Sequence, residues 1–141
     1  MTVQISELRK YRLSRVAGQY AVCRLVVGSP VPAWAAGDGF WSVTKTDEEL
    51  SVVCLAERIP AEVQAARDWA CFWLQGPFDF AETGVLAGLI APLSAKGVSI
   101  FAISTYDTDY ILVKQADAAR AENIWRKLGH ELGPSYEHIS P

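Results

Sequence analysis

The sequence has few of the residues from which metal centres and nucleophilic sites are built. Its 141 residues include only three cysteines and two histidines. The cysteines (Cys23, Cys54 and Cys71) lie in separate apolar runs, and no metal-ligand spacing occurs. Their odd number predicts buried, reduced thiols in a cytoplasmic protein. No serine sits in a nucleophile elbow and no glycine-rich phosphate loop occurs, so we expect neither an enzyme nor a bound cofactor.

An excess of charge of one sign and a long apolar run are also missing. The formal net charge is only -3, with both signs scattered, which argues against a nucleic-acid partner. The longest apolar run, residues 84–93, contains Pro92 and is shorter than the roughly 20 residues that span a bilayer, so no membrane partner is expected. Half of the residues are nevertheless apolar and 11% are aromatic, which is enough for a packed interior.

The chain contains an internal repeat of pattern. Residues 40–54, FWSVTKTDEELSVVC, align without a gap with residues 100–114, IFAISTYDTDYILVK, at an offset of 60. Each copy reads as a strand, an acidic turn and a strand, which is typical of a hairpin. Upstream, AVCRL at residues 21–25 resembles ACFWL at residues 70–74, at an offset of 49. We therefore expect two related units, each with a strand before its hairpin.

The two units differ in the helices that they are expected to contain. In the second, residues 82–96 (ETGVLAGLIAPLSAK) carry apolar side chains at three- and four-residue spacing. A second helix is expected after Asp117 and before Gly129, followed by a short strand at residues 131–132. In the first unit a short helix is expected at residues 60–67, and an extra strand near residues 3–16. The pattern predicts an α+β fold with antiparallel sheets.

The β-α-β-β-α-β order, carried by TGVLAGLIAPLSAKGVSIFAISTYDTDYILVK, resembles an ACT domain. It is most similar to the ACT modules of aspartate kinases and of CASTOR-type arginine sensors, over about residues 69–129. The resemblance implies two ferredoxin-like (βαββαβ) units in tandem, with helices on one face of the sheets. The first, at residues 1–66, would be shortened, and the second would occupy residues 67–141. It also implies a regulatory module whose ligand is a small molecule, such as an amino acid.

The resemblance further implies where that ligand would bind. The residues concerned are Asp109, Thr83, Gly84, Val85, Leu86, Ile103, Ser104 and Thr105. The four at residues 83–86 start a helix, where unpaired N–H groups suit a ligand carboxylate. In the arginine sensors an acidic residue aligned with Asp109 contacts the ligand, and backbone groups at residues 103–105 would complete the site. The alternative is that Asp107 and Asp109 only form the turn, and that Gly84 serves helix packing.

The sequence is compatible with two functions of different classes. The first is a ligand-binding regulatory module that acts through a partner or a change of oligomeric state. The second is a protein-interaction or assembly module without a ligand, which the shortened first unit favours. Small sheets leave edges that need covering, so a homodimer or higher oligomer is expected in either case. An enzyme using Asp107 or Asp109 as a base would lack an accompanying acid, nucleophile or metal.

Overall fold

The computed structural model describes residues 9–77 and 84–136, and the following elements lie within those ranges. The strands are β1 (Arg12–Leu25), β2 (Ser42–Lys45), β3 (Leu50–Leu55), β4 (Ala65–Leu74), β5 (Ile100–Ser104), β6 (Asp109–Lys114) and β7 (Glu131–Leu132). The α-helices are α1 (Val85–Ala95) and α2 (Ala118–Lys127). Two short 3₁₀ helices, Ala56–Arg58 and Gln115–Asp117, follow β3 and β6 respectively.

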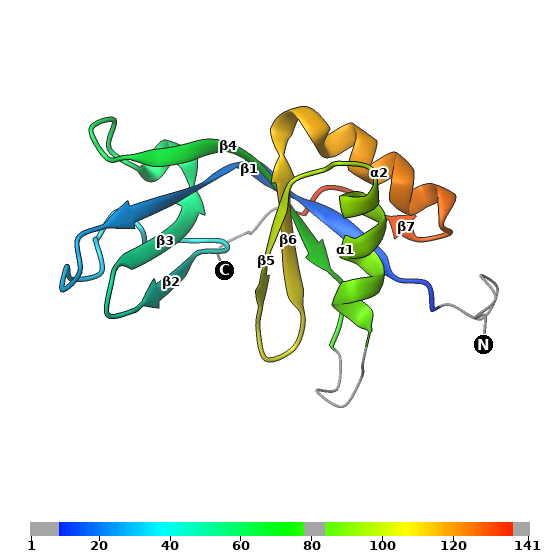
Figure 1. Cartoon of the computed structure of the whole chain (residues 1–141), viewed down its shortest axis with the longest axis horizontal. Helices are drawn as coiled ribbons and strands as arrows, with labels where there is room; N and C mark the ends of the chain where they lie inside the picture. The colour runs from blue at the N-terminus through cyan, green and yellow to red at the C-terminus, as the bar shows by residue number, and fades with distance from the viewer. Residues whose placement is uncertain (1–8, 78–83, 137–141) are drawn as a thin grey trace.

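All of these strands join one sheet in the order β2-β3-β1-β4-β6-β5, and β7 pairs with the start of β1. The pairs along this path are antiparallel, whereas β7 is parallel to β1. The predicted α+β class and antiparallel pairing are thus confirmed, although the strands form one sheet rather than separate sheets. The sheet curls, with β2 and β3 at one end and β5, β6 and both helices at the other, while β1 and β4 run between the ends (Figure 1). The predicted boundary between residues 66 and 67 falls inside β4, so the division into two units remains a prediction.

The strand at the start of the chain is longer than predicted. A strand near residues 3–16 and another at residues 21–25 were expected, but residues 12–25 form the single strand β1, and residues 1–8 lie outside the described part. Its pairing with β4 shifts between Val16 and Tyr20, which marks a β-bulge. Gly18, with φ +93°, supplies a backbone conformation that other residues rarely adopt there. The bulge lets one strand serve both ends of the curled sheet.

The short helix predicted at residues 60–67 is wrong. Residues 61–62 form a turn, in which the Val63 N–H donates to the Pro60 carbonyl at 3.0 Å, and β4 begins at Ala65. The Arg67 guanidinium instead donates to four backbone carbonyls, those of Ala56, Ile59, Pro60 and Val63. Because one side chain satisfies these carbonyls, the loop keeps its non-helical course without leaving them unpaired.

Both predicted hairpins are confirmed, but the alignment between them is wrong by one position. The Thr46 N–H donates to the Glu49 carbonyl at 2.9 Å, and the Thr105 N–H donates to the Thr108 carbonyl at 2.8 Å. In each turn the fourth residue's N–H also donates to the threonine Oγ1, at 3.1 Å and 3.2 Å. Thr46 and Thr105 are therefore equivalent, which makes the offset 59 rather than 60. A slip of one position matters because it reverses which face each side chain occupies.

Burial supports the corrected offset. The buried run at residues 52–54 in β3 matches the buried run at residues 111–113 in β6. The 3₁₀ helices that follow these strands share the corrected offset as well. The offset of 49 upstream is confirmed by strand register, because Tyr20 pairs with Leu55 as Trp69 pairs with Lys114. The two halves of the chain therefore resemble each other in strand pairing as well as in sequence pattern.

The equivalence of the two turns can be tested with Thr46→Ala and Thr105→Ala. Each change removes a hydroxyl that accepts a backbone N–H, so each is expected to lower the free energy of unfolding by about 0.5–1.5 kcal/mol. Urea denaturation would measure both, with Thr44→Ala on the exposed face of β2 as a control that changes stability little. A loss in one turn only would contradict their equivalence.

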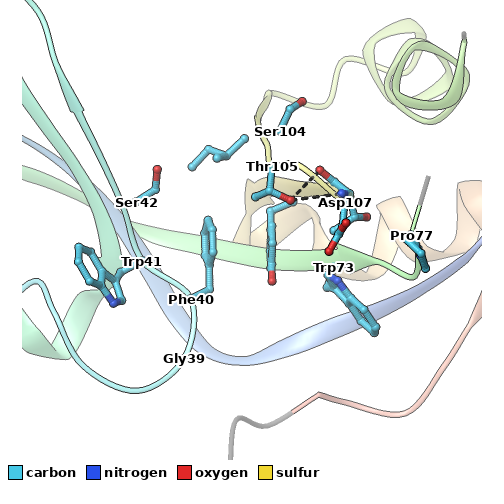
Figure 2. Close-up of a pocket in the computed structure, with 13 residues that line it drawn as sticks. Gly39, Phe40, Trp41, Ser42, Trp73, Pro77, Ser104, Thr105 and Asp107 are labelled. Carbon is cyan, nitrogen blue, oxygen red and sulfur yellow. Dashed lines mark hydrogen bonds between the residues drawn. The ribbon is translucent and has the colours of Figure 1, made fainter. Parts of the chain in front are cut away.

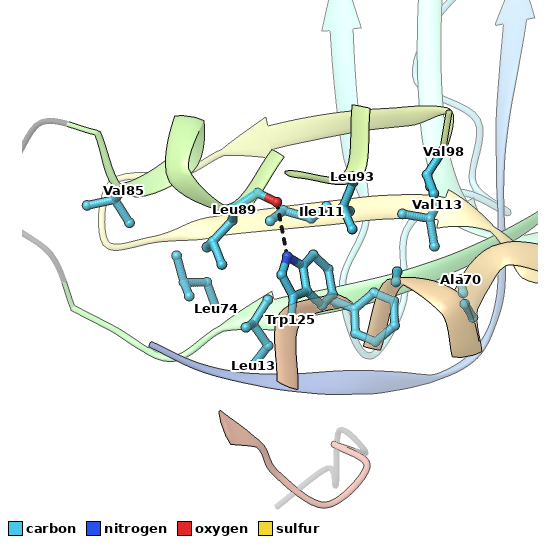
Figure 3. Close-up of a cluster of buried hydrophobic side chains, with 13 residues drawn as sticks. Leu13, Ala70, Leu74, Val85, Leu89, Leu93, Val98, Ile111, Val113 and Trp125 are labelled. Carbon is cyan, nitrogen blue, oxygen red and sulfur yellow. Dashed lines mark hydrogen bonds between the residues drawn. The ribbon is translucent and has the colours of Figure 1, made fainter. Parts of the chain in front are cut away.

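The helices pack on one face of the sheet. Helix α1 contains Pro92, and its N-cap residue is Gly84, with φ 77°. Helix α2 begins after Asp117, as predicted, although that side chain makes no capping hydrogen bond. Trp125 of α2 lies at the centre of the core, where its Nε1 donates to the Leu89 carbonyl at 3.0 Å (Figure 3). Its ring also meets Phe72 of β4 edge-on, at 5.1 Å between centroids.

The opposite face of the sheet carries a second apolar cluster. Along β6, Ile111 and Val113 join the helix-side core, whereas Leu112 joins the cluster on the other face. The three cysteines are free and buried, as predicted, and burial raises the pKa of Cys54 to about 11. Within residues 9–77 and 84–136, no helix is long and apolar enough to cross a membrane.

Candidate functional site

A groove of about 650 Å³ opens between the loop before β2 and the second hairpin. The loop contributes residues 39–42, the end of β4 contributes Trp73, and the hairpin contributes residues 103–105 with Asp107 and Thr108. Figure 2 shows these side chains converging from segments that are far apart in the sequence. The groove lies on the sheet face opposite the helices, because Phe40, Trp73 and Tyr110 pack against the cluster on that face.

Stacked aromatic rings form the apolar part of the groove. Phe40 lies parallel to Tyr110, with 4.0 Å between ring centroids and 9° between planes. It also contacts Tyr20, at 5.9 Å. Burial, and to a smaller degree Cys71, raises the pKa of Tyr110, so its phenol stays neutral at physiological pH. The stack ties the loop before β2 to the second hairpin and forms one wall of the groove.

The polar part comes from the turn between β5 and β6. Ser104 Oγ donates to the carboxylate of Asp109 across the strand pair at 2.5 Å. Thr108 Oγ1 donates to the Leu74 carbonyl, which ties the turn to the end of β4. Asp107 is exposed and is the acidic residue among those that line the groove. The arrangement offers one carboxylate and several hydroxyls beside aromatic surface, which is the usual composition of a small-molecule site.

The predicted site residues fall into two places. Ile103, Ser104 and Thr105 line the groove, as residues of a binding site would. Asp109 is half-buried, contacts Ser104, and does not line the groove. It shares a strand face with Ile111 and Val113, which is the face that the helices cover.

The helix start lies on that same side of the sheet. Gly84 is exposed, with open space where a Cβ would stand, while Val85 is buried and Leu86 packs against the helix-side core. Thr83 lies outside the described residues, as do residues 78–82 before it. The pocket predicted between Asp109 and the helix start therefore remains a prediction.

Sequence reasoning missed the aromatic wall and the position of Asp107 in the groove. Phe40 and Tyr110 looked like ordinary alternating strand residues, and Asp107 like a turn former. No local signal could place Phe40 on Tyr110, because the two lie in different hairpins, far apart in the sequence.

Comparisons with known proteins agree with this architecture. The family model of the ACT domain matches residues 64–127, and a model described as an N-terminal domain matches residues 18–62. A crystal structure of a protein from Agobacterium tumefaciens is 41% identical, with a TM-score of 0.86, and the match covers 95% of this chain and 100% of that one.

Two further similarities concern regulatory proteins. Subunit 1 of the cytosolic arginine sensor for mTORC1 from Bos taurus is 32% identical over 67% of this chain, which spans only 34% of that protein. The ligand-free regulatory subunit of aspartate kinase from Thermus thermophilus shares the fold, with a TM-score of 0.57 at 9% identity, covering 79% of this chain and 93% of that one. Through residues 64–127, this chain belongs to the ACT-domain family.

Proposed function

We propose that this chain is a regulatory module that binds an amino acid and passes the signal on through a partner or through its own oligomerisation. The observation that carries the proposal is the ACT-domain match at residues 64–127, joined to 32% identity with a protein named as an arginine sensor. That name also supports a cytoplasmic location. No catalytic role is proposed for the chain.

The proposed ligand site lies between the start of α1 and the second hairpin. Helix α1 has 11 residues, and its N-cap residue Gly84 has no side chain to cap the first N–H groups, which would donate to the ligand's carboxylate. The space beside Gly84 is open. Asp109 would hold the ligand's cationic group. Ser104 Oγ, which donates to the Asp109 carboxylate at 2.5 Å, would fix that carboxylate in place. Thr83, Val85 and Leu86 would complete the helix start, and backbone groups at residues 103–105 the hairpin side.

We further propose that two ferredoxin-like ACT units stand in tandem, the first shortened. The support is the shared Thr turn, the matched buried runs and the matched 3₁₀ helices, which all follow the same offset. Strands β2 and β5 end the sheet path, so their outer edges are available for pairing with a second copy. A homodimer formed at such an edge would connect ligand binding to assembly.

The alternative function is an assembly module that binds no ligand. A specific observation favours it: the connection between β1 and β2 contains no α-helix, so the first half has no counterpart of α1. The same connection exposes Val26, Val27 and Val31, at 77%, 49% and 52% of their surface. Exposed apolar side chains of this kind suit a protein contact better than a small-molecule site.

A thermal-shift panel of the 20 amino acids, tested one at a time, separates the two functions. A ligand at about 100 times its dissociation constant adds roughly 2.7 kcal/mol of stability, which raises Tm by several degrees in a domain of this size. We expect at least one amino acid to do so. No shift with any amino acid, together with a dimer by light scattering, would favour the assembly function.

A further inference from the structure

A second cavity, of about 320 Å³, lies beside the groove and shares Gly39 and Phe40 with it. Apolar and aromatic side chains make up most of its wall, among them Val16, Tyr20, Phe40, Leu55 and Tyr136. The cation in this wall is Arg58, the last residue of the 3₁₀ helix after β3. The wall also contains Asp38, so the cavity combines aromatic surface with one guanidinium and one carboxyl side chain.

Two contacts position the Arg58 side chain. Its Nη2 donates to the backbone carbonyl of Asp38, which also lines the cavity, at 2.6 Å. The guanidinium also lies flat against Gly37, where an added Cβ would come within 2.9 Å of both terminal nitrogens. These two contacts set the position of the guanidinium.

One nitrogen of this guanidinium lacks a partner. Arg58 Nη1 is buried and makes no hydrogen bond within the described structure. An unsatisfied buried donor costs about 1–3 kcal/mol, and more when it is charged, so such a group calls for a reason. Binding of an anion would supply the missing acceptor. Because Nη1 is covered, the guanidinium would have to turn slightly outward from Gly37 to meet it.

The charge of Arg58 also acts on the cavity wall. Burial raises the pKa of Tyr20 well above its usual value, and Cys71 raises it further by a smaller amount. The positive charge of Arg58 lowers this pKa and so opposes both effects. Tyr20 is 1% exposed, so the charge is felt where little water screens it. A positive charge close to shielded aromatic surface favours an anion that also carries an apolar group.

We propose that this cavity binds a small molecule with a carboxylate attached to a flat apolar group. Arg58 pairs with the carboxylate, and the flat group lies against the rings of Tyr20, Phe40 and Tyr136. The guanidinium suits this role because its N–H groups match the two carboxylate oxygens. The site lies on the opposite sheet face from Asp109 and Gly84 and does not depend on the proposed amino-acid function.

Benzoate and benzamide are the matched probes, since they share a ring and differ in charge. Calorimetric titration of the full chain should show saturable binding of benzoate and at least about tenfold weaker binding of benzamide, one hydrogen-bonded charge pair being worth about that much. Arg58→Gln should weaken benzoate binding by about tenfold or more. Arg24→Gln, an exposed arginine on β1 that does not line this cavity, should leave it unchanged.

If benzoate does not bind to the unmodified chain, the proposal is overturned. Equal affinity in Arg58→Gln and the unmodified chain would overturn it as well. If Arg58→Gln fails to fold, Arg58→Lys replaces it, because lysine keeps the charge but loses the paired geometry. The affinity of Arg58→Lys for benzoate should then be at least about threefold lower than that of the unmodified chain. An unchanged affinity would again overturn the proposal.

Discussion

Replacing Trp125 by alanine is expected to lower the free energy of unfolding by about 3–5 kcal/mol, the range typical of a large core aromatic. Trp125 is fully buried and sits among residues of α1, β4 and β6. Truncation would leave a cavity between α1 and the sheet and remove the contact with Phe72. It would also leave the Leu89 carbonyl without the indole N–H that it accepts. Denaturant unfolding followed by circular dichroism measures the loss.

Two variants show which part of Trp125 matters. Trp125→Phe keeps most of the ring but removes the N–H, so its smaller loss, about 1–3 kcal/mol, reports the lost hydrogen bond to the Leu89 carbonyl and the remaining void. Trp41→Ala is the matched control, since that ring is 38% exposed and stays outside the helix-side core. A loss below about 1 kcal/mol for Trp125→Ala would contradict the central place of this residue in the core.

Asp109→Asn is expected to weaken binding of the amino-acid ligand by about 10- to 100-fold, because a hydrogen bond to a charged group contributes about 1.5–3 kcal/mol. The asparagine oxygen can still accept from Ser104 Oγ, and Asn forms turns as readily as Asp, so the hairpin should be preserved. Calorimetry with the amino acid that gives the largest thermal shift measures the change.

Asp107→Asn is the matched control for Asp109→Asn. Both residues belong to the same hairpin, but Asp107 lies in the turn and lines the groove, whereas Asp109 begins β6. The proposed site predicts nearly unchanged affinity for Asp107→Asn. A larger loss at Asp107 than at Asp109 would move the ligand into the groove beside Phe40. Equal affinity for all three proteins would leave both aspartates as turn formers.

The parts of the fold that the sequence predicts are those set by local periodicity. Alternating residues around the turn at Thr105 predicted the β5–β6 hairpin, and the stripe leading to Trp125 predicted α2. The errors come from long-range effects. Residues 60–67 follow a non-helical course because Arg67 satisfies four carbonyls between residues 56 and 63. β1 runs unbroken past Gly18 because it pairs with β4 on both sides of the bulge and with β3 after it.

The candidate site divides in the same way. Residues 103–105 were predicted from the resemblance and do line a groove. The other wall of that groove could not be predicted, because Phe40 meets Tyr110 only after the two hairpins are brought together by β1 and β4. The unpartnered nitrogen of Arg58 was equally hidden, since it depends on the carbonyl of Asp38 and the approach of Gly37. Sequence patterns predict which residues alternate, but not which loops meet.

The most direct test of the proposed ligand site is an amide NMR titration of the chain with the amino acid that most raises its Tm. Saturable shifts are expected at Gly84, Val85 and Leu86 and at residues 103–105 and 109, with a single dissociation constant. Amides near Arg58, in the cavity proposed for carboxylates, should move little. The account would be contradicted if no amino acid shifted the helix-start amides, or if the saturable shifts clustered around Phe40 and Trp73 instead.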